Sequence, residues 1–211
     1  VDGKGKLIEI LEDIAENYMK GTPNGIRCDK ESGLVFSPAH FTWMDTNYPA
    51  ATPREGYPIE IQALWYSALN FLAKVTGKNK WIEFALKVKE AINILYLLKN
   101  RDWLSDCLHG ISGVPAPEAS PDDSLRPNQL FTITLGAIDN FDLRVKILNS
   151  AQELLVPGAI RSIADRPVHF QLPVINGNGQ LLNHPSEPYW GHYIGDEDTR
   201  RKLAYHNGTA W

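Results

Sequence analysis

PIEIQALWYSALNFLAKVT, residues 58–76, is the clearest indication of secondary structure in the chain. Its apolar residues recur at spacings of three and four, which predicts a helix, and Pro58 is suited to the first helical turn. This helix ends at Gly77, and residues 80–98 repeat the same apolar spacing. Because the connection between the two segments is so short, we expect two helices that pack as antiparallel neighbours.

Three further segments carry a helical pattern: residues 5–19, residues 127–138 and residues 141–155. The connections between the helices are long, and we expect them to gather on one rim: residues 22–57, 100–125 and 156–204. Most of the regular structure is therefore predicted to be helical. We expect an all-α fold in which the helices form part of a toroid and the rim carries the site.

Two features of the chain are not helical. IRCD and LVFS are strand-like patches within residues 22–57, and the turn sequence NGNG, residues 176–179, predicts a small β-hairpin. The hairpin lies within residues 166–190, which we interpret as an insertion. Five or six helices cannot close a toroid of twelve, so we expect residues 1–211 to be one part of a larger domain.

The composition is that of an ordinary globular protein. The 211 residues are 43% hydrophobic and 22% charged, which excludes disorder, collagen and coiled-coil arrays. A net charge of −4 argues against a nucleic-acid-binding protein, and no apolar run reaches the roughly 18 to 20 residues that span a bilayer. No signal peptide is visible, and Cys28 and Cys107 lack the spacing of a zinc site. We therefore expect a soluble, cytoplasmic protein.

Aromatic residues are frequent in the polar loops. Six Trp and eight Tyr are more than a core alone requires. An aromatic ring at a wet surface offers an apolar face to a ligand that is partly polar. Sugars, peptides and nucleobases all fit this description, so the composition leaves the ligand class open.

The densest group of polar and aromatic residues is FTWMDTN, residues 41–47, followed by TPREGYPIE, residues 52–60. Asp45 stands beside Trp43 and Met44, a partly apolar setting in which a carboxyl group can keep its proton at neutral pH. A general acid needs that property. The alternative is a surface aspartate that caps a turn, and composition alone favours this alternative.

Two further blocks combine polar side chains of several kinds. In DDSLRPNQ, residues 122–129, helix capping explains the acidic residues and the serine, but it does not explain Arg126, Asn128 and Gln129. In YHNGTAW, residues 205–211, a structural role is the commoner explanation for His206. The histidines lack metal-ligand spacing, and neither a phosphate loop nor a serine-hydrolase elbow is present. We expect no metal and no cofactor.

Five blocks of the chain stand in the order in which the glycogen debranching enzyme family has them: TWMD (42–45), TPREGYPIEIQALWYSAL (52–69), DDSLRPNQLF (122–131), GAIRSIAD (158–165) and YHNGTAW (205–211). The chain resembles the amylo-α-1,6-glucosidase domain of that family. The resemblance implies an (α/α)6 toroid and a glycoside hydrolase that inverts the anomeric centre. It also implies the substrate, an α-1,6-linked glucose stub on glycogen or another branched α-glucan.

The resemblance also implies roles for single residues. Asp45, the aspartate of the TWMD block, is implied to be the general acid. The residues implied to face the glucose are Arg54, Glu60, Arg126, Asn128, Gln129 and His206, with Trp43 and Trp211 as candidates to stack on the ring. The general base is implied to be a glutamate that follows the YHNGTAW block. Residues 1–211 are accordingly expected to be a partial catalytic domain, without the base and the C-terminal helices.

Three alternatives stay open. A glucoamylase-like α-1,4 glucosidase would share the toroid, because the choice of linkage depends on the shape of the pocket. A carbohydrate-binding fragment without catalysis would need no base. A helical interaction protein would use the same aromatic residues as core. Comparing the hydrolysis of isomaltose-type and maltose-type stubs tests the first alternative. Sugar binding without turnover would indicate the second, and the absence of any sugar binding would indicate the third.

Overall fold

A computed structural model describes residues 6–45, 49–191 and 206–210 of the chain. Its α-helices are α1 (Leu7–Lys20), α2 (Ile59–Thr76), α3 (Asn79–Leu95), α4 (Leu130–Thr134) and α5 (Phe141–Ala151). Its strands are β1 (Arg27–Cys28), β2 (Val35–Phe36), β3 (Gly56–Pro58), β4 (Cys107–His109), β5 (Ser120–Pro121), β6 (Leu155–Val156) and β7 (Ala159–Ile160). Three short 3-10 helices complete the regular structure: η1 (Ala116–Glu118), η2 (Pro127–Gln129) and η3 (Gln152–Leu154).

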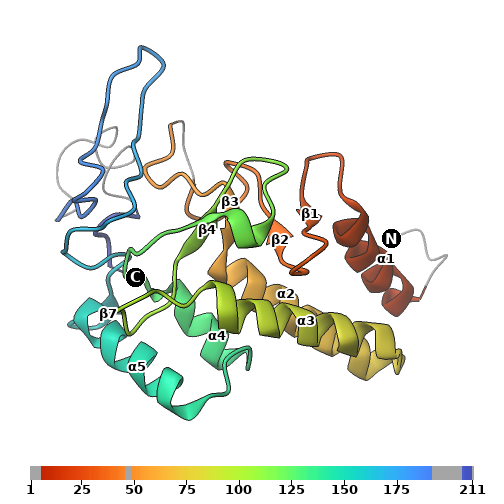
Figure 1. The fold of residues 1–211 in the computed structure, drawn as a ribbon. Helices are drawn as coiled ribbons and strands as arrows, with labels where there is room; N and C mark the ends of the chain where they lie inside the picture. Colours follow the sequence, from red (N-terminus) through yellow and green to blue (C-terminus); the bar gives the residue numbers. More distant parts are fainter. Residues whose placement is uncertain (1–5, 46–48, 192–205, 211) are drawn as a thin grey trace.

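The helices α2 and α3 form the base of the fold. Gly77 ends α2 with a φ of 68°, and its N–H donates to the carbonyl of Ala73, a left-handed helix end that suits glycine. Because α3 begins two residues later, the chain turns back and the two helices lie side by side (Figure 1). Leu69 of α2 and Ile92 of α3 are fully buried in the core. The structure thus has the antiparallel pair that the sequence predicts.

The connections between the helices pair as small antiparallel sheets. β1 pairs with β2, β6 pairs with β7, and β4 lies between β3 and β5. A bridge between Ser37 and Gly56 joins the first of these sheets to the β3–β4–β5 sheet. In Figure 1 the strands β1 to β4 lie on one side of the α2–α3 pair. The connection from β2 to β3, which contains Trp43, Asp45 and Arg54, begins and ends on this side.

The expectation of an all-α fold is wrong. The described residues form five α-helices together with seven strands in three sheets, so the chain has a mixed α/β fold and not an all-α toroid. Backbone N–H and C=O groups that are buried need hydrogen-bond partners, and the long connections satisfy theirs by pairing with one another. The patches IRCD and LVFS contain β1 and β2, and β3, β4 and β5 come from the segments next to them in space.

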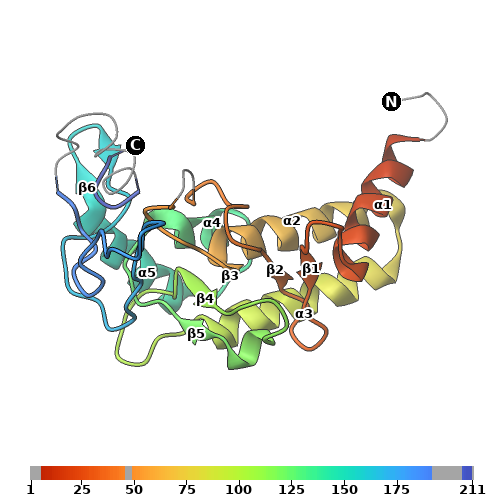
Figure 2. The ribbon, with the colours of Figure 1, turned by 90° about the horizontal axis from the view of Figure 1, so that it is seen from above.

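Residues 166–190, called the arm below, extend from the body of the fold as a long loop (Figure 1). The arm lies at the opposite end of the α2–α3 pair from α1, as the view from above also shows (Figure 2). The expected hairpin is reduced to one bridge, between Ile175 and Leu181, and the N–H of Gly179 donates to Asn176 across the turn. The turn residues therefore act as predicted, but the flanking segments form no named strands.

Both cysteines are buried free thiols. No helix among the described residues has the length and apolar character that crossing a membrane requires.

Candidate active site

A buried ion pair joins the segment before β3 to the first turn of α2. Nη1 and Nη2 of Arg54 donate to Oε1 and Oε2 of Glu60 at 2.5 and 2.8 Å. This bidentate geometry makes arginine–carboxylate pairs strong. Nη2 of Arg54 also donates to the carbonyl of Asp106 at 3.0 Å. The side chain of Arg54 is 1% exposed. Burial acts to lower the pKa of Arg54, but Asp106 and Glu60 outweigh it and raise this pKa.

A second arginine connects the centre of the chain to its last described residues. Nη1 of Arg126 donates to the carbonyls of Ser162 at 3.2 Å and His206 at 2.5 Å, and Nη2 donates to Oδ1 of Asn207 at 2.8 Å. Asn207 in turn donates from Nδ2 to the carbonyl of Ala51. The blocks 122–129 and 205–211, apart in sequence, are therefore held together by one buried side chain.

Asp106 lies between the two arginines and is not among the residues predicted from the sequence. Its Oδ2 is 3.1 Å from Nη2 of Arg54 and 3.7 Å from Nε of Arg126, and its Oδ1 accepts a hydrogen bond from Asn128 at 2.8 Å. Burial raises the pKa of Asp106 although both arginines act to lower it. The sequence does contain a signal, a single carboxylate inside the mainly apolar run WLSDCL, because a carboxylate that is buried with such a run needs a cation beside it.

Asn128 and Gln129 brace this network from η2. Asn128 donates to Asp106 and also contacts the sulfur of Met44 at 3.0 Å, which ties η2 to the loop of Asp45. The side-chain oxygen of Gln129 accepts the N–H of Leu104. Both amides are nearly inaccessible to solvent and their hydrogen bonds run to the protein itself.

Asp45 caps its own loop. Its Oδ2 accepts the N–H of His40 at 2.6 Å, and its Oδ1 accepts the N–H and the hydroxyl of Thr42 at 2.9 and 2.5 Å. These three hydrogen bonds hold the Asp45 carboxylate against its own loop. His40 adopts a φ of 64°, which is uncommon outside glycine. The side chain of Asp45 is therefore buried and occupied by the loop that carries it.

His206 and Trp43 form the contact between the Asp45 loop and the last described residues. Their rings meet edge to face, with centroids 4.9 Å apart. Burial lowers the pKa of His206 to about 4, and the positive charges of Arg126 and Arg54 act in the same direction, so the imidazole is neutral at pH 7. Trp43 is 43% exposed. Trp211, the other predicted stacking residue, lies outside the described residues.

Asp123 fastens the arm to the body of the fold. Its Oδ1 accepts the N–H groups of His169 and Phe170 at 2.8 and 3.0 Å, and its Oδ2 lies 2.9 Å from Nδ1 of His169 and 3.1 Å from Arg101. Burial acts to raise the pKa of Asp123, but the hydrogen bonds from Phe170, His169 and Arg101 outweigh it and lower this pKa. Helix capping, the sequence-based explanation, does not describe these contacts.

The predicted residues thus come together, but inside the protein. One buried network contains the side chains of Arg54, Glu60, Arg126, Asn128 and Gln129 and the main chain of His206. The Asp45 loop adjoins it through two contacts, Met44 with Asn128 and Trp43 with His206. Among the predicted residues that the structure describes, Trp43 is the exposed one.

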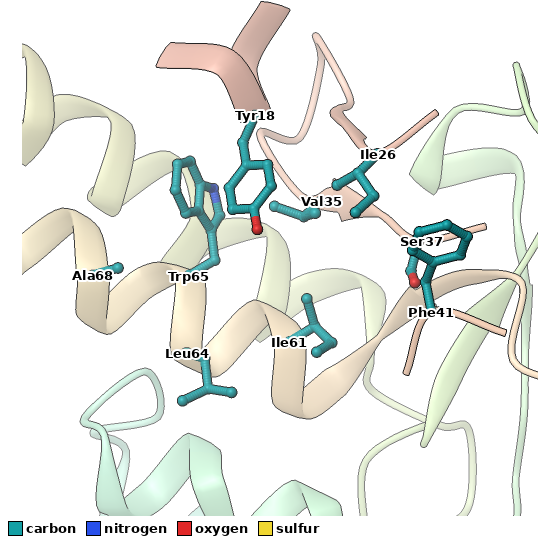
Figure 3. Close-up of a pocket in the computed structure, with 9 residues that line it drawn as sticks. All are labelled: Tyr18, Ile26, Val35, Ser37, Phe41, Ile61, Leu64, Trp65 and Ala68. Atoms are coloured by element: carbon teal, nitrogen blue, oxygen red, sulfur yellow. The ribbon is translucent and has the colours of Figure 1, made fainter. Parts of the chain in front are cut away.

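A mainly apolar cavity lies elsewhere. It has a volume of about 280 Å³ and is bordered by Tyr18 of α1, Trp65 of α2 and Phe41 of the loop before Asp45 (Figure 3). None of the predicted site residues lines it. Within the described residues no group of three His, Cys, Asp or Glu side chains is placed to hold a metal ion.

Comparison with known families identifies the chain. The family model described as amylo-alpha-1,6-glucosidase matches residues 5–211, which include all of the blocks that meet in the buried network. A comparison with curated proteins finds no match. The family match covers nearly the whole chain, and the residues that the family blocks contribute lie side by side in the fold. The chain therefore belongs to the amylo-α-1,6-glucosidase family of glycogen-debranching-type glycosidase domains.

Proposed function

We propose that this domain hydrolyses the α-1,6 bond of a single glucose stub on a branched α-glucan, with inversion of the anomeric centre and with Asp45 as the general acid. The observation that carries the proposal is the family match over residues 5–211. The geometry supports it, because the blocks around Asp45, Arg54, Arg126 and His206 meet in three dimensions. The family description also favours α-1,6 over α-1,4 hydrolysis.

The loop of Asp45 suggests how a carboxyl group can serve as an acid there. The hydroxyl of Thr42 lies 2.5 Å from Oδ1, and a hydroxyl group can donate or accept. When Asp45 takes up a proton, Thr42 can reverse its role and accept the hydrogen bond. Departure of the sugar oxygen then requires Asp45 to turn its proton from Thr42 to the glycosidic oxygen. Trp43, exposed next to it, offers an apolar face to the glucose ring.

An inverting hydrolase also needs a second carboxylate. The two carboxyl groups stand about 6.5 to 9.5 Å apart, so that a water molecule fits between the base and the sugar. By resemblance, we propose that this base is the glutamate that follows the YHNGTAW block in the family. The buried carboxylates Glu60 and Asp106 face arginines, and we assign them to positioning.

Carbohydrate binding without catalysis is the second candidate. The observation that favours it is the carboxylate of Asp45, which is 2% exposed and already accepts three hydrogen bonds. A protein of this kind would bind branched α-glucan but release no glucose.

The replacement Asp45→Asn in the intact protein tests the proposal. The amide keeps the shape of the side chain but cannot donate a proton to the leaving oxygen, so release of glucose from α-1,6 stubs should fall by about 10² to 10⁴-fold while glucan binding persists. NMR of the released glucose should show the β-anomer first. A substrate with a good leaving group, which needs no proton, should partly restore the rate of this variant.

The matched control is Asp102→Asn, since Asp102 is an exposed aspartate paired with Lys146 at the surface. Its rate should equal that of the unmodified protein. A loss of less than tenfold in Asp45→Asn would place the acid at another residue. Glucan binding with no release of glucose by the unmodified protein would favour the second candidate.

A further inference from the structure

An open groove separates the arm from the end of the β3–β4–β5 sheet. The groove, called the arm groove below, has a volume of about 400 Å³, within the range of roughly 300 to 1,000 Å³ typical of small-molecule sites. Its lining includes Glu55, His109 and Ile111 on the sheet side and Phe170, Gln171 and Leu172 on the arm side. None of the residues assigned above to the glucose pocket lines it.

The sheet positions the polar wall of this groove. Successive side chains in extended chain point to opposite faces, so Arg54 enters the buried network while Glu55 reaches the groove. Gly56 pairs with His109, and a Cβ at Gly56 would lie 2.1 Å from the carbonyl of Leu108. The close approach of β3 and β4 that brings Glu55 beside His109 therefore depends on glycine.

The arm supplies an opposite wall that is fixed in place. The ring of Phe170 stacks on His109, with centroids 4.6 Å apart and an angle of 11° between the planes. Nε2 of His109 lies 3.4 Å from Oδ2 of Asp122, and Asp123 accepts the N–H groups at the start of the arm. The geometry of the groove is thus set by contacts that exist without a ligand.

The lining combines polar and apolar groups in the way that a sugar requires. The carboxylate of Glu55 has no hydrogen-bond or ion-pair partner among the residues that the structure describes. Ile111 is 68% exposed although it is apolar, and Leu172 also lines the groove. No Lys or Arg lines the groove, so its charge disfavours phosphates and other anions.

We propose that the arm groove binds α-1,4-linked glucose units of the glucan chain. In this role it is a subsite for the main chain that carries the stub, an assignment that rests on the proposed function. Glu55 accepts hydrogen bonds from sugar hydroxyls, and the apolar side chains cover the CH face of the ring. The groove thereby contributes to affinity for the polymer and takes no part in breaking the bond.

The test measures binding of maltotetraose, an unbranched oligosaccharide without an α-1,6 bond, by calorimetric titration of the intact protein. Glu55→Ala and Ile111→Ser should each weaken binding about tenfold, the effect of losing a hydrogen bond to a charged group or an apolar contact. Ile111 is exposed and Glu55 is half-buried, and circular dichroism of each variant checks that the fold is retained. Glu55→Gln, which keeps one acceptor oxygen, should restore part of the affinity.

The matched controls are Glu118→Ala on η1 and Ile94→Ser on α3, both exposed and outside the groove. They should bind maltotetraose like the unmodified protein. On a branched substrate the groove variants should raise KM and leave kcat unchanged. Absence of maltotetraose binding by the unmodified protein, or unchanged affinity in both groove variants, would overturn the proposal.

The outcomes separate this proposal from the proposed function. If glucose is released from stubs while the groove variants bind and react as the unmodified protein does, the groove proposal is wrong and the hydrolase stands. If maltotetraose binding depends on Glu55 but no glucose is released from stubs, the groove is a glucan site and the hydrolase proposal is wrong.

Discussion

Replacement of Arg126 by methionine removes a cation that holds three segments of the chain together. The guanidinium donates to the carbonyls of Ser162 and His206 and to Oδ1 of Asn207, and it faces Asp106. Methionine fills a similar volume but donates no hydrogen bond, so three buried acceptors and one carboxylate lose a partner. Breaking a buried ion pair on one side costs about 3–5 kcal/mol.

This loss is large compared with the stability of a typical domain, about 5–15 kcal/mol. For a chain of this size each kcal/mol lowers Tm by roughly 2–4 °C, so Arg126→Met should lower Tm by roughly 6 to 20 °C. Urea unfolding followed by circular dichroism gives the free energy of unfolding, and hydrogen exchange shows whether the amides near Asn207 open first.

The control is Lys146→Met, which breaks the exposed pair with Asp102. Exposed ion pairs contribute at most about 1 kcal/mol, so this variant should unfold close to the unmodified protein. If Arg126→Met loses less than about 1 kcal/mol, or no more than the control, the buried network does not stabilise the fold in the way described.

Two further predictions concern the sheet and the arm. Gly56→Ala should lower the free energy of unfolding by about 3 kcal/mol or more, because the new Cβ would meet the carbonyl oxygen of Leu108 at 2.1 Å and the φ of this residue is +132°. Urea unfolding measures this loss. The control is Gly113→Ala, which isolates the cost of a positive φ because a Cβ there would have nothing within 4 Å. Because the folded pKa of Asp123 is lowered, its stabilisation is complete above its unfolded value of about 4 and is lost as the pH falls through the lower folded pKa. Proteolysis of the arm should therefore become faster only below about pH 4, whereas in Asp123→Asn it should be fast at pH 7 as well; equal rates in both proteins at pH 7 would contradict this role.

The sequence predicts the helices of this fold better than its strands. The pattern of residues 58–76 and 80–98 matches α2 and α3 closely, because long apolar periodicity leaves few alternatives. The strands are two or three residues long, too short for an alternating pattern. β3 contains Gly56 and Pro58, residues that usually argue against a strand. These positions become strands because distant segments pair with them.

The sequence indicates which residues lie close together when they belong to one polar block. It does not do so for a polar residue that stands alone in an apolar run. Arg54 and Glu60 stand six residues apart in one block and lie together in the fold, but they bind each other, a contact that was not predicted from the sequence. Asp106 has no such neighbours in sequence, so its place between two arginines follows only from the tertiary fold. For Asp45 the capping alternative describes the hydrogen bonds to its own loop, but the sequence does not indicate that this carboxylate is buried.

The contact between Thr52 and Asn207 joins positions 155 residues apart, and this has a consequence for folding during synthesis. Ribosomes add about 5–20 residues per second, so roughly 8 to 30 s pass between the emergence of these two partners. Until residues 206 and 207 emerge, Arg126 lacks two of its final acceptors, the carbonyl of His206 and Oδ1 of Asn207. A nascent chain in this state can accept the same segment from a neighbouring copy, so crowded polysomes are where exchange of the last residues between two molecules is most favoured.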